Sequence, residues 1–189
     1  MTYFPGTIGL PDAASPPMCN KSWTITAQIE VPDDKAQGMV VTHGGLEGGY
    51  GLYLRDGKPT FVYNFLSVER FTFAAKNSLP KGKWTLVVDF KYDGGGMGKG
   101  GSLTMSANGT TIAEGRLEKT IPMQFSLGEG LDIGMDVSSP VDFTYKLPFA
   151  FTGRIEQVTI DLAAPAVDTK KEPAAATARV LVGTGRERR

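Results

Sequence analysis

The sequence predicts an all-β protein, an antiparallel two-sheet sandwich of the jelly-roll kind. Apolar and polar residues alternate with a period of two in several stretches, and Asp-Gly and Asn-Gly pairs separate some of them. The 24 glycines and 12 prolines suit the turns between many short strands. Alternation is typical of a strand with one buried face, and both dipeptides tolerate the positive φ of a tight hairpin. No stretch gives a convincing helix.

Residues 50–65 hold the clearest hairpin, and Asp56-Gly57 is its predicted turn. A hairpin alone is marginal in water, so its apolar face needs a second sheet or more strands to cover it. The predicted apolar face carries Tyr50, Leu52, Leu54, Phe61, Tyr63 and Phe65.

Strands on both sides of this hairpin supply that cover. The strand over 83–92 has five apolar side chains on one side, and burying each is worth roughly 1.5–3 kcal/mol before entropy. Asn108-Gly109 marks a second tight hairpin. The other predicted strands span 22–31, 38–42, 68–75, 102–107, 110–117 and 149–162, with brief apolar pieces at 125–127 and 131–133.

The chain of 189 residues suits one folded domain. We expect an extended arm over 1–21, the sandwich over 22–162 and a disordered Ala/Pro/Lys-rich tail over 163–189. The first residues have no basic and apolar leader, and no run of about 18 apolar residues occurs. As written, the sequence predicts a cytoplasmic location.

Charge and cysteine content restrict the partners. The 20 basic and 20 acidic residues give a net charge of zero, so neither nucleic acid nor a membrane is an expected partner, although binding by a local patch stays open. Cys19 is the only cysteine, which excludes an intrachain disulfide, a four-cysteine zinc site and a CxxC redox pair.

Two features could suggest a nucleotide-binding loop and a catalytic histidine, but their sequence context supports neither. The glycine-rich stretch 93–101 lacks the Walker pattern, because Asp93 stands where glycine is required and Gly100 where Ser or Thr should hold magnesium. We expect a mobile loop between two strands. His43 is the only histidine, and no GxSxG motif accompanies it, so its expected role is packing at a strand end or a hydrogen bond to the adjacent glycine turn.

Four residues are candidate binding groups. Tyr53 points away from Leu52 and Leu54, on the same side of the strand as Arg55, so we expect an exposed Tyr-Arg pair that could meet a glycan or a partner. Asp132 and Asp136, with Glu129 and Asp142 nearby, could supply oxygen ligands for calcium, although the spacing is not that of an EF-hand. Otherwise no cofactor is expected.

Five segments in order resemble the C-terminal region of large bacterial arylsulfatases, from about Tyr3 to Leu162. The loop YDGGGMGKGG is the most specific of these matches, and the strand–DGK–strand and FxGxIxxVxI patterns are also similar to laminin-G and concanavalin-A-like sandwiches. The segments are GGYGLYLRDGKPTFVYNF, VERFTF, LPKGKWTLVVDFKYDGGGMGKGGSLTM, FSLGEGLDIGMDVSSPV and FTGRIEQVTIDL.

The resemblance implies an accessory domain and no enzyme. Sulfatases hydrolyse sulfate esters with a formylglycine made in a CxPxR-type motif of an α/β domain that also holds calcium. Here Cys19 is followed by Asn20, Lys21 and Ser22, so the motif is absent and no catalytic residue transfers. We expect a non-catalytic sandwich that packs on, or completes, a sulfatase catalytic domain in the same or another chain.

Two alternatives remain open. The first is an independent carbohydrate-binding, lectin-like module, which an exposed aromatic row or a calcium site would favour. The second is a free-standing hydrolase, which would need Asp or Glu pairs that converge in a cleft. The sequence gives no reason to expect such pairs.

Overall fold

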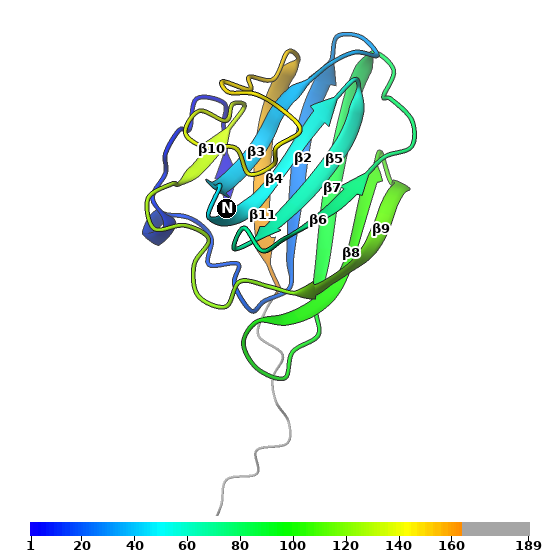
Figure 1. The fold of residues 1–189 in the computed structure, drawn as a ribbon. Helices are drawn as coiled ribbons and strands as arrows, with labels where there is room; N and C mark the ends of the chain where they lie inside the picture. The colour runs from blue at the N-terminus through cyan, green and yellow to red at the C-terminus, as the bar shows by residue number, and fades with distance from the viewer. Residues whose placement is uncertain (164–189) are drawn as a thin grey trace, which may run out of the picture.

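The computed structural model describes residues 1–163 as two antiparallel sheets that pack face to face (Figure 1). This arrangement confirms the predicted two-sheet sandwich. Within these residues the helical structure amounts to one 3-10 turn, η1 (Asp12–Ala14). No helix in this range has the length and hydropathy needed to cross a membrane.

The two sheets contain six and five strands, and every neighbouring pair is antiparallel. The six-stranded sheet has the spatial order β1 (Thr2–Tyr3), β11 (Arg154–Leu162), β2 (Trp23–Val31), β7 (Gly82–Tyr92), β8 (Lys99–Ala107) and β9 (Thr110–Lys119). The five-stranded sheet has the order β10 (Leu131–Ile133), β3 (Gly38–Gly45), β4 (Gly48–Arg55), β5 (Lys58–Phe65) and β6 (Glu69–Ala74).

Both predicted hairpin turns are confirmed. Asp56 and Gly57 have φ of 49° and 71°, and Arg55 lies opposite Lys58. Asn108 and Gly109 have φ of 46° and 80° between β8 and β9. Two consecutive positive φ values match the right-handed twist of the flanking strands, which sets the strand register locally.

The main core fills the space between the sheets. The β2 side chains alternate between buried and half-buried along the whole strand, as the sequence period predicts. The Trp23 ring lies 5.2 Å from Phe90 of its own sheet and 5.8 Å from Phe61 of the facing sheet, measured between centroids. Aromatic side chains therefore join the two sheets near the centre of the core.

A long loop over residues 134–150, here called the covering loop, crosses the outer face of the five-stranded sheet (Figure 1). Both of its ends are held to β3, because the Gly134 N–H donates to the Val40 carbonyl at 3.0 Å and the Met39 N–H donates to the Phe149 carbonyl at 3.0 Å. Gly51 permits the close approach, since a Cβ there would lie 2.9 Å from a Val141 methyl. This loop creates a second apolar cluster outside the sandwich.

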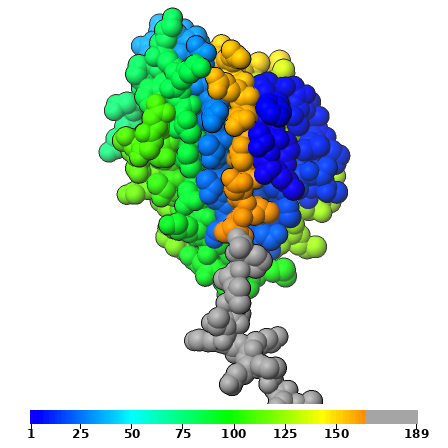
Figure 2. Space-filling model, turned by 180° about the vertical axis from the view of Figure 1, so that it is seen from behind, coloured from blue at the N-terminus to red at the C-terminus, as the bar shows by residue number. Residues whose placement is uncertain are grey.

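The outer face of the six-stranded sheet is open. Figure 2 shows the strips of β2 and β11 side by side on this face with no segment across them. Most of its side chains are polar, and Thr26 lies between Thr159 and the apolar Val87 in neighbouring strands. The two faces of the molecule therefore differ, one covered by a loop and one exposed.

The first 21 residues belong to the sandwich, although they were expected as an extended arm. Thr2 and Tyr3 of β1 pair with β11, and η1 follows, with Asp12 beside His43. The expected tail, 163–189, lies outside the described residues from position 164 onward.

Candidate functional site

The predicted exposure of Tyr53 is wrong. Its side chain is only 2% exposed, because the covering loop lies over the face to which it points. The alternation of residues correctly separates Tyr53 from Leu52 and Leu54, but it does not reveal what covers the outer side. Arg55 at the end of β4 is exposed. The structure therefore does not present these two residues as a joint surface pair.

Tyr53 instead attaches the covering loop to β4. Its hydroxyl donates to the Asp142 carboxylate at 2.8 Å and lies 3.1 Å from the Thr144 hydroxyl. Its ring packs edge-on against Tyr145 and Phe149, with centroids 5.4 and 5.9 Å away. Burial raises the Tyr53 pKa, so the phenol remains a neutral donor.

The two aspartates expected to bind calcium accept hydrogen bonds from donors within the protein. Asp132 accepts from the Gly9 N–H at 2.6 Å, and buried Asp136 accepts from the Tyr145 hydroxyl. Burial raises the pKa of Asp136 to about 6. Residues 1–163 contain no group of three or more His, Cys, Asp or Glu placed to hold a metal ion. Calcium binding stays a prediction without such a cluster to support it.

His43 is buried within β3, as expected for a packing residue. Its Nε2 lies 3.0 Å from an Asp12 carboxylate oxygen, and its ring meets Phe125 edge-on at 5.1 Å. Burial outweighs the attraction of Asp12 and lowers the His43 pKa to about 4. The imidazole is therefore neutral at pH 7. Burial also raises the pKa of the Cys19 thiol to about 11, which keeps it in its weakly nucleophilic form.

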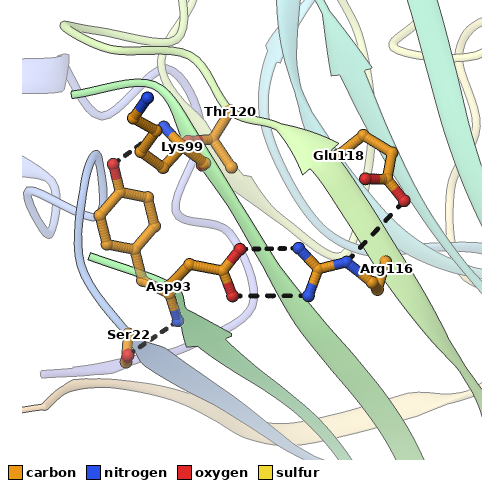
Figure 3. Close-up of polar contacts among 7 residues, drawn as sticks. Ser22, Asp93, Lys99, Arg116, Glu118 and Thr120 are labelled. Carbon is orange, nitrogen blue, oxygen red and sulfur yellow. Dashed lines mark hydrogen bonds and ion pairs between the residues drawn. The ribbon is translucent and has the colours of Figure 1, made fainter. Parts of the chain in front are cut away.

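Residues 93–98 of the glycine-rich stretch form a loop between β7 and β8, as predicted, but 99–101 belong to β8, and several polar contacts hold in place the loop that was expected to be mobile (Figure 3). The Asp93 carboxylate pairs with both terminal nitrogens of Arg116 at 2.7 and 3.4 Å. The Tyr92 hydroxyl accepts from the Lys99 N–H at 3.0 Å, and the Thr120 hydroxyl donates to the Lys99 carbonyl at 2.8 Å. These contacts tie the loop to β9 and give it a structural role.

A groove of about 600 Å³ opens near one end of the sandwich, where the edge strands β6 and β9 meet. The edges lie close together, because a Cβ on Gly115 would be 2.7 Å from the Phe73 ring. The groove is lined by residues 75–80, Trp84 and most of the 107–112 hairpin. A shallower extension of about 590 Å³ continues between β6 and β9. We call the whole feature the edge groove.

The floor of the edge groove is apolar and fixed. Ala75, Leu79 and Ala107 are buried, and the half-buried Trp84 donates its indole N–H to the Pro80 carbonyl at 2.9 Å. The wall formed by 75–80 is attached to the central hairpin, since the Leu79 N–H donates to the Gly57 carbonyl at 2.8 Å. The groove is therefore formed before any ligand arrives.

The rim of the edge groove carries polar groups that the fold leaves unused. Within the described residues, no hydrogen bond or ion pair engages the side chains of Lys76, Asn77, Ser78, Thr110 and Thr111. Asn108 differs from them, because its side-chain oxygen accepts from the Thr85 N–H at 2.8 Å and so shapes the turn. A ligand would meet an indole, an ammonium, an amide and three hydroxyls.

Sequence reasoning missed the edge groove. Asn77 and Ser78 look like ordinary turn residues, and Thr110 and Thr111 follow a hairpin pair about thirty positions later. Trp84 is one of the five apolar side chains predicted on one side of the strand over 83–92, and it does contact the core, but the alternation does not show that it is also partly exposed. The antiparallel topology is what brings these residues together.

Comparisons with known proteins identify the fold. Neither a protein-family model nor a curated protein matches the sequence. Among solved structures, the CBM40 of Ruminococcus gnavus IT-sialidase bound to α2,6 sialyllactose has a TM-score of 0.53 at 14% identity, over 78% of this chain and 80% of that chain. Domains LG4-5 of the mouse laminin α1 chain have a TM-score of 0.57 at 12% identity, over 86% of this chain and 43% of that chain.

A third structure places the same fold within a longer enzyme. The leech intramolecular trans-sialidase in complex with 2,7-anhydro-Neu5Ac has a TM-score of 0.52 at 12% identity, over 87% of this chain and 26% of that chain. None of these three proteins is a sulfatase, so the sulfatase resemblance stays a prediction. Identities this low show the fold alone. The chain has the lectin-like jelly-roll sandwich that CBM40 and laminin-G domains share.

Proposed function

We propose that this chain is a non-catalytic glycan-binding module and that the edge groove is its binding site. The observation that carries the proposal is the combination of a fixed, half-buried indole with five unengaged polar side chains around one preformed groove. The part of the edge groove that contains Trp84 has a volume of about 600 Å³, within the range of small-molecule pockets, about 300–1,000 Å³.

The chemistry of a sugar fits this arrangement. A pyranose ring has an apolar face of C–H groups and a rim of hydroxyls, so it can lie on an aromatic ring while its edge makes hydrogen bonds. Here Trp84 and Ile112 provide the apolar surface, and Asn77 and Thr111 provide donors and acceptors at the rim. Because none of these polar groups has an internal partner, binding would replace water and no existing contact would be lost.

The fold of the neighbours adds support of a general kind. The CBM40 structures that share the sandwich are bound to sialyllactose, and their module is a carbohydrate-binding one. Shared fold alone does not transfer a ligand or its site, so the proposal rests on the groove. A sulfatase domain as partner rests only on the sequence resemblance, and no contact surface described above favours it.

A glycan array with purified protein tests the proposal, followed by titration of the best-binding glycan. Trp84→Ala should weaken binding about tenfold or more, because it removes the stacking surface. Asn77→Ala and Thr111→Ala should each weaken it about fivefold by removing one hydrogen bond. These two polar residues are exposed and far from the core, so their variants should fold normally even if Trp84→Ala is less stable.

A matched control separates the groove from the rest of the surface. Thr26→Ala and Thr104→Ala remove similar hydroxyls from the open face of the six-stranded sheet and should leave glycan affinity unchanged. Equal losses in the groove and control variants would contradict the assignment of the site. Absence of any signal across neutral and acidic glycans would contradict the function itself.

A further inference from the structure

The edge groove is longer than the part that contains Trp84. That part has a volume of about 600 Å³, and the extension between β6 and β9 is a second hollow of about 590 Å³. The two hollows are continuous, because Lys76, Thr111 and Ile112 line both of them. From Thr111 to Glu114, β9 follows the extension for about 10 Å, at about 3.3 Å per residue. The groove is therefore elongated along the edge strands.

A β-bulge in β9 extends the apolar floor of the groove into the extension. Met105 lies opposite Ala113 and Ser106 lies opposite Thr111, so Ile112 is an extra residue in β9. Consecutive residues of a regular strand point to opposite faces, whereas a bulge re-aims side chains. Ile112 and Ala113 are both half-buried, and both pack against the main core. Because Ile112 lines both parts of the groove and Ala113 lines the extension, the apolar floor is continuous.

Polar groups lie along both sides of the extension. Thr72 of β6 and Glu114 of β9 are exposed, and within residues 1–163 neither side chain takes part in a hydrogen bond or an ion pair. Both strands are at the edges of their sheets, so each has a row of backbone N–H and C=O groups without a strand partner. The Ala75 N–H donates to the Pro59 carbonyl of β5 at 2.9 Å, so by alternation the backbone groups of Thr72 and Ala74 face away from β5. The extension therefore offers donors and acceptors beside its apolar floor.

The extension is too narrow to admit a polypeptide strand between β6 and β9. A strand bonded to both edges needs about 4.8 Å on each side, hence about 9.6 Å between the two strands. Cα atoms of β6 and β9 approach within 8 Å of one another, and a Cβ on Gly115 would lie 2.7 Å from the Phe73 ring. Beyond the extension, the Lys119 ammonium reaches from β9 to Glu69 of β6 at 3.0 Å. A ligand therefore lies on the floor of the groove and does not join the two sheets.

We propose that the edge groove binds a glycan as a chain of linked sugar units, with one unit stacked on Trp84 and the following units along Ile112 and Ala113 in the extension. The proposal rests on the glycan-binding function proposed above and names the class of ligand. Each unit of such a chain repeats a C–H face and a rim of hydroxyls, and the groove continues an apolar floor between polar sides. A ligand that consists of one terminal sugar would leave the extension in contact with water.

The two parts of the groove have separate polar residues, so the contribution of each part can be measured. Asn77 and Ser78 line the part with Trp84 and not the extension, whereas Thr72 and Glu114 line the extension alone. Linked units belong to one molecule, so contacts in the extension form without a second loss of translational freedom. Affinity should therefore rise with chain length until the extension is filled.

Calorimetric titration with a series of oligosaccharides of increasing length, built from the sugar unit that binds best on the array, tests the proposal. Wild-type affinity should rise about tenfold or more above that of the shortest member that binds, and then level off. Thr72→Ala and Glu114→Ala should each lower the affinity for long members about fivefold, by removing one hydrogen bond, and leave that for the shortest member unchanged. Both residues are exposed, so these variants should fold normally. In a ¹H–¹⁵N spectrum, the amides of 72–74 and 113–114 should shift with the longer members alone.

Matched changes outside the groove complete the test. Thr26→Ala on the open face and Glu47→Ala in the β3–β4 turn remove the same side-chain types and should leave affinity unchanged at every length. Equal wild-type affinity for short and long members would overturn the proposal, and so would losses in the Thr72 and Glu114 variants that do not depend on length. Competition for the groove by a peptide of alternating Val and Thr would also overturn it. Binding that still requires Trp84 would in the first two cases leave the glycan-binding function intact, whereas the absence of any glycan binding would overturn both.

Discussion

Tyr53→Ala is expected to lower the free energy of unfolding by about 3–5 kcal/mol, the usual cost of truncating a large buried aromatic side chain. The change removes the ring that packs against Tyr145 and Phe149 and the hydroxyl that donates to Asp142. Because folded domains are stable by only about 5–15 kcal/mol, this loss should be plain in urea unfolding at neutral pH.

Two companion variants separate the causes. Tyr53→Phe keeps the ring and should cost only about 1 kcal/mol, because the Thr144 hydroxyl still donates to Asp142 at 2.8 Å. Arg55→Ala, two residues along the same side of β4, should change stability by less than about 0.5 kcal/mol. If Tyr53→Ala proved as mild as Arg55→Ala, the covering loop would not be packed on the sheet in solution.

Acidification from about pH 6.5 to about pH 4 should remove about 3 kcal/mol of the stability that buried His43 contributes in its neutral form. Burial lowers the His43 pKa to about 4 in the folded protein, whereas the unfolded chain binds the proton near pH 6.5. Across this window the unfolded state holds more protons, so stability falls as the pH falls. Unfolding free energies measured at several pH values report this slope.

The contribution of His43 is measured as the difference in unfolding free energy between wild type and a His43 variant. This difference is needed because Asp136 changes the stability with pH in the opposite direction. Its raised pKa, about 6, means that the stability from its protonated form is lost as the pH rises through that value. The destabilisation caused by His43→Gln, relative to wild type, should therefore be largest near neutral pH and shrink toward pH 4. A difference that stays constant over this range would show that His43 does not titrate as described.

The sandwich itself was predictable because its signals are local. The period of two placed a strand over 22–31, and β2 runs from Trp23 to Val31. The Asp56-Gly57 and Asn108-Gly109 pairs fixed two hairpins without information from elsewhere in the chain. Such patterns depend on a few adjacent residues, so they can be interpreted without knowledge of the tertiary structure.

The functional surfaces were not predictable in the same way. Tyr53 is buried through Asp142, 89 positions away, inside a loop whose sequence shows no regular period. The edge groove likewise combines 75–80, Trp84 and the β8–β9 hairpin, which only the strand order brings together. Long-range contacts of this kind decide which polar residues are buried, paired or free. The alternation of residues along one strand does not predict these contacts.

The most direct test of glycan binding in the edge groove is a titration followed by the indole N–H signals in a ¹H–¹⁵N spectrum. The chain has two tryptophans, so Trp23 in the core serves as an internal control for Trp84 in the groove. Addition of the best array glycan should shift the Trp84 signal and the amides of 76–78 and 110–111, while the Trp23 signal stays in place. Saturable binding that leaves Trp84 and these amides unmoved would contradict the assignment.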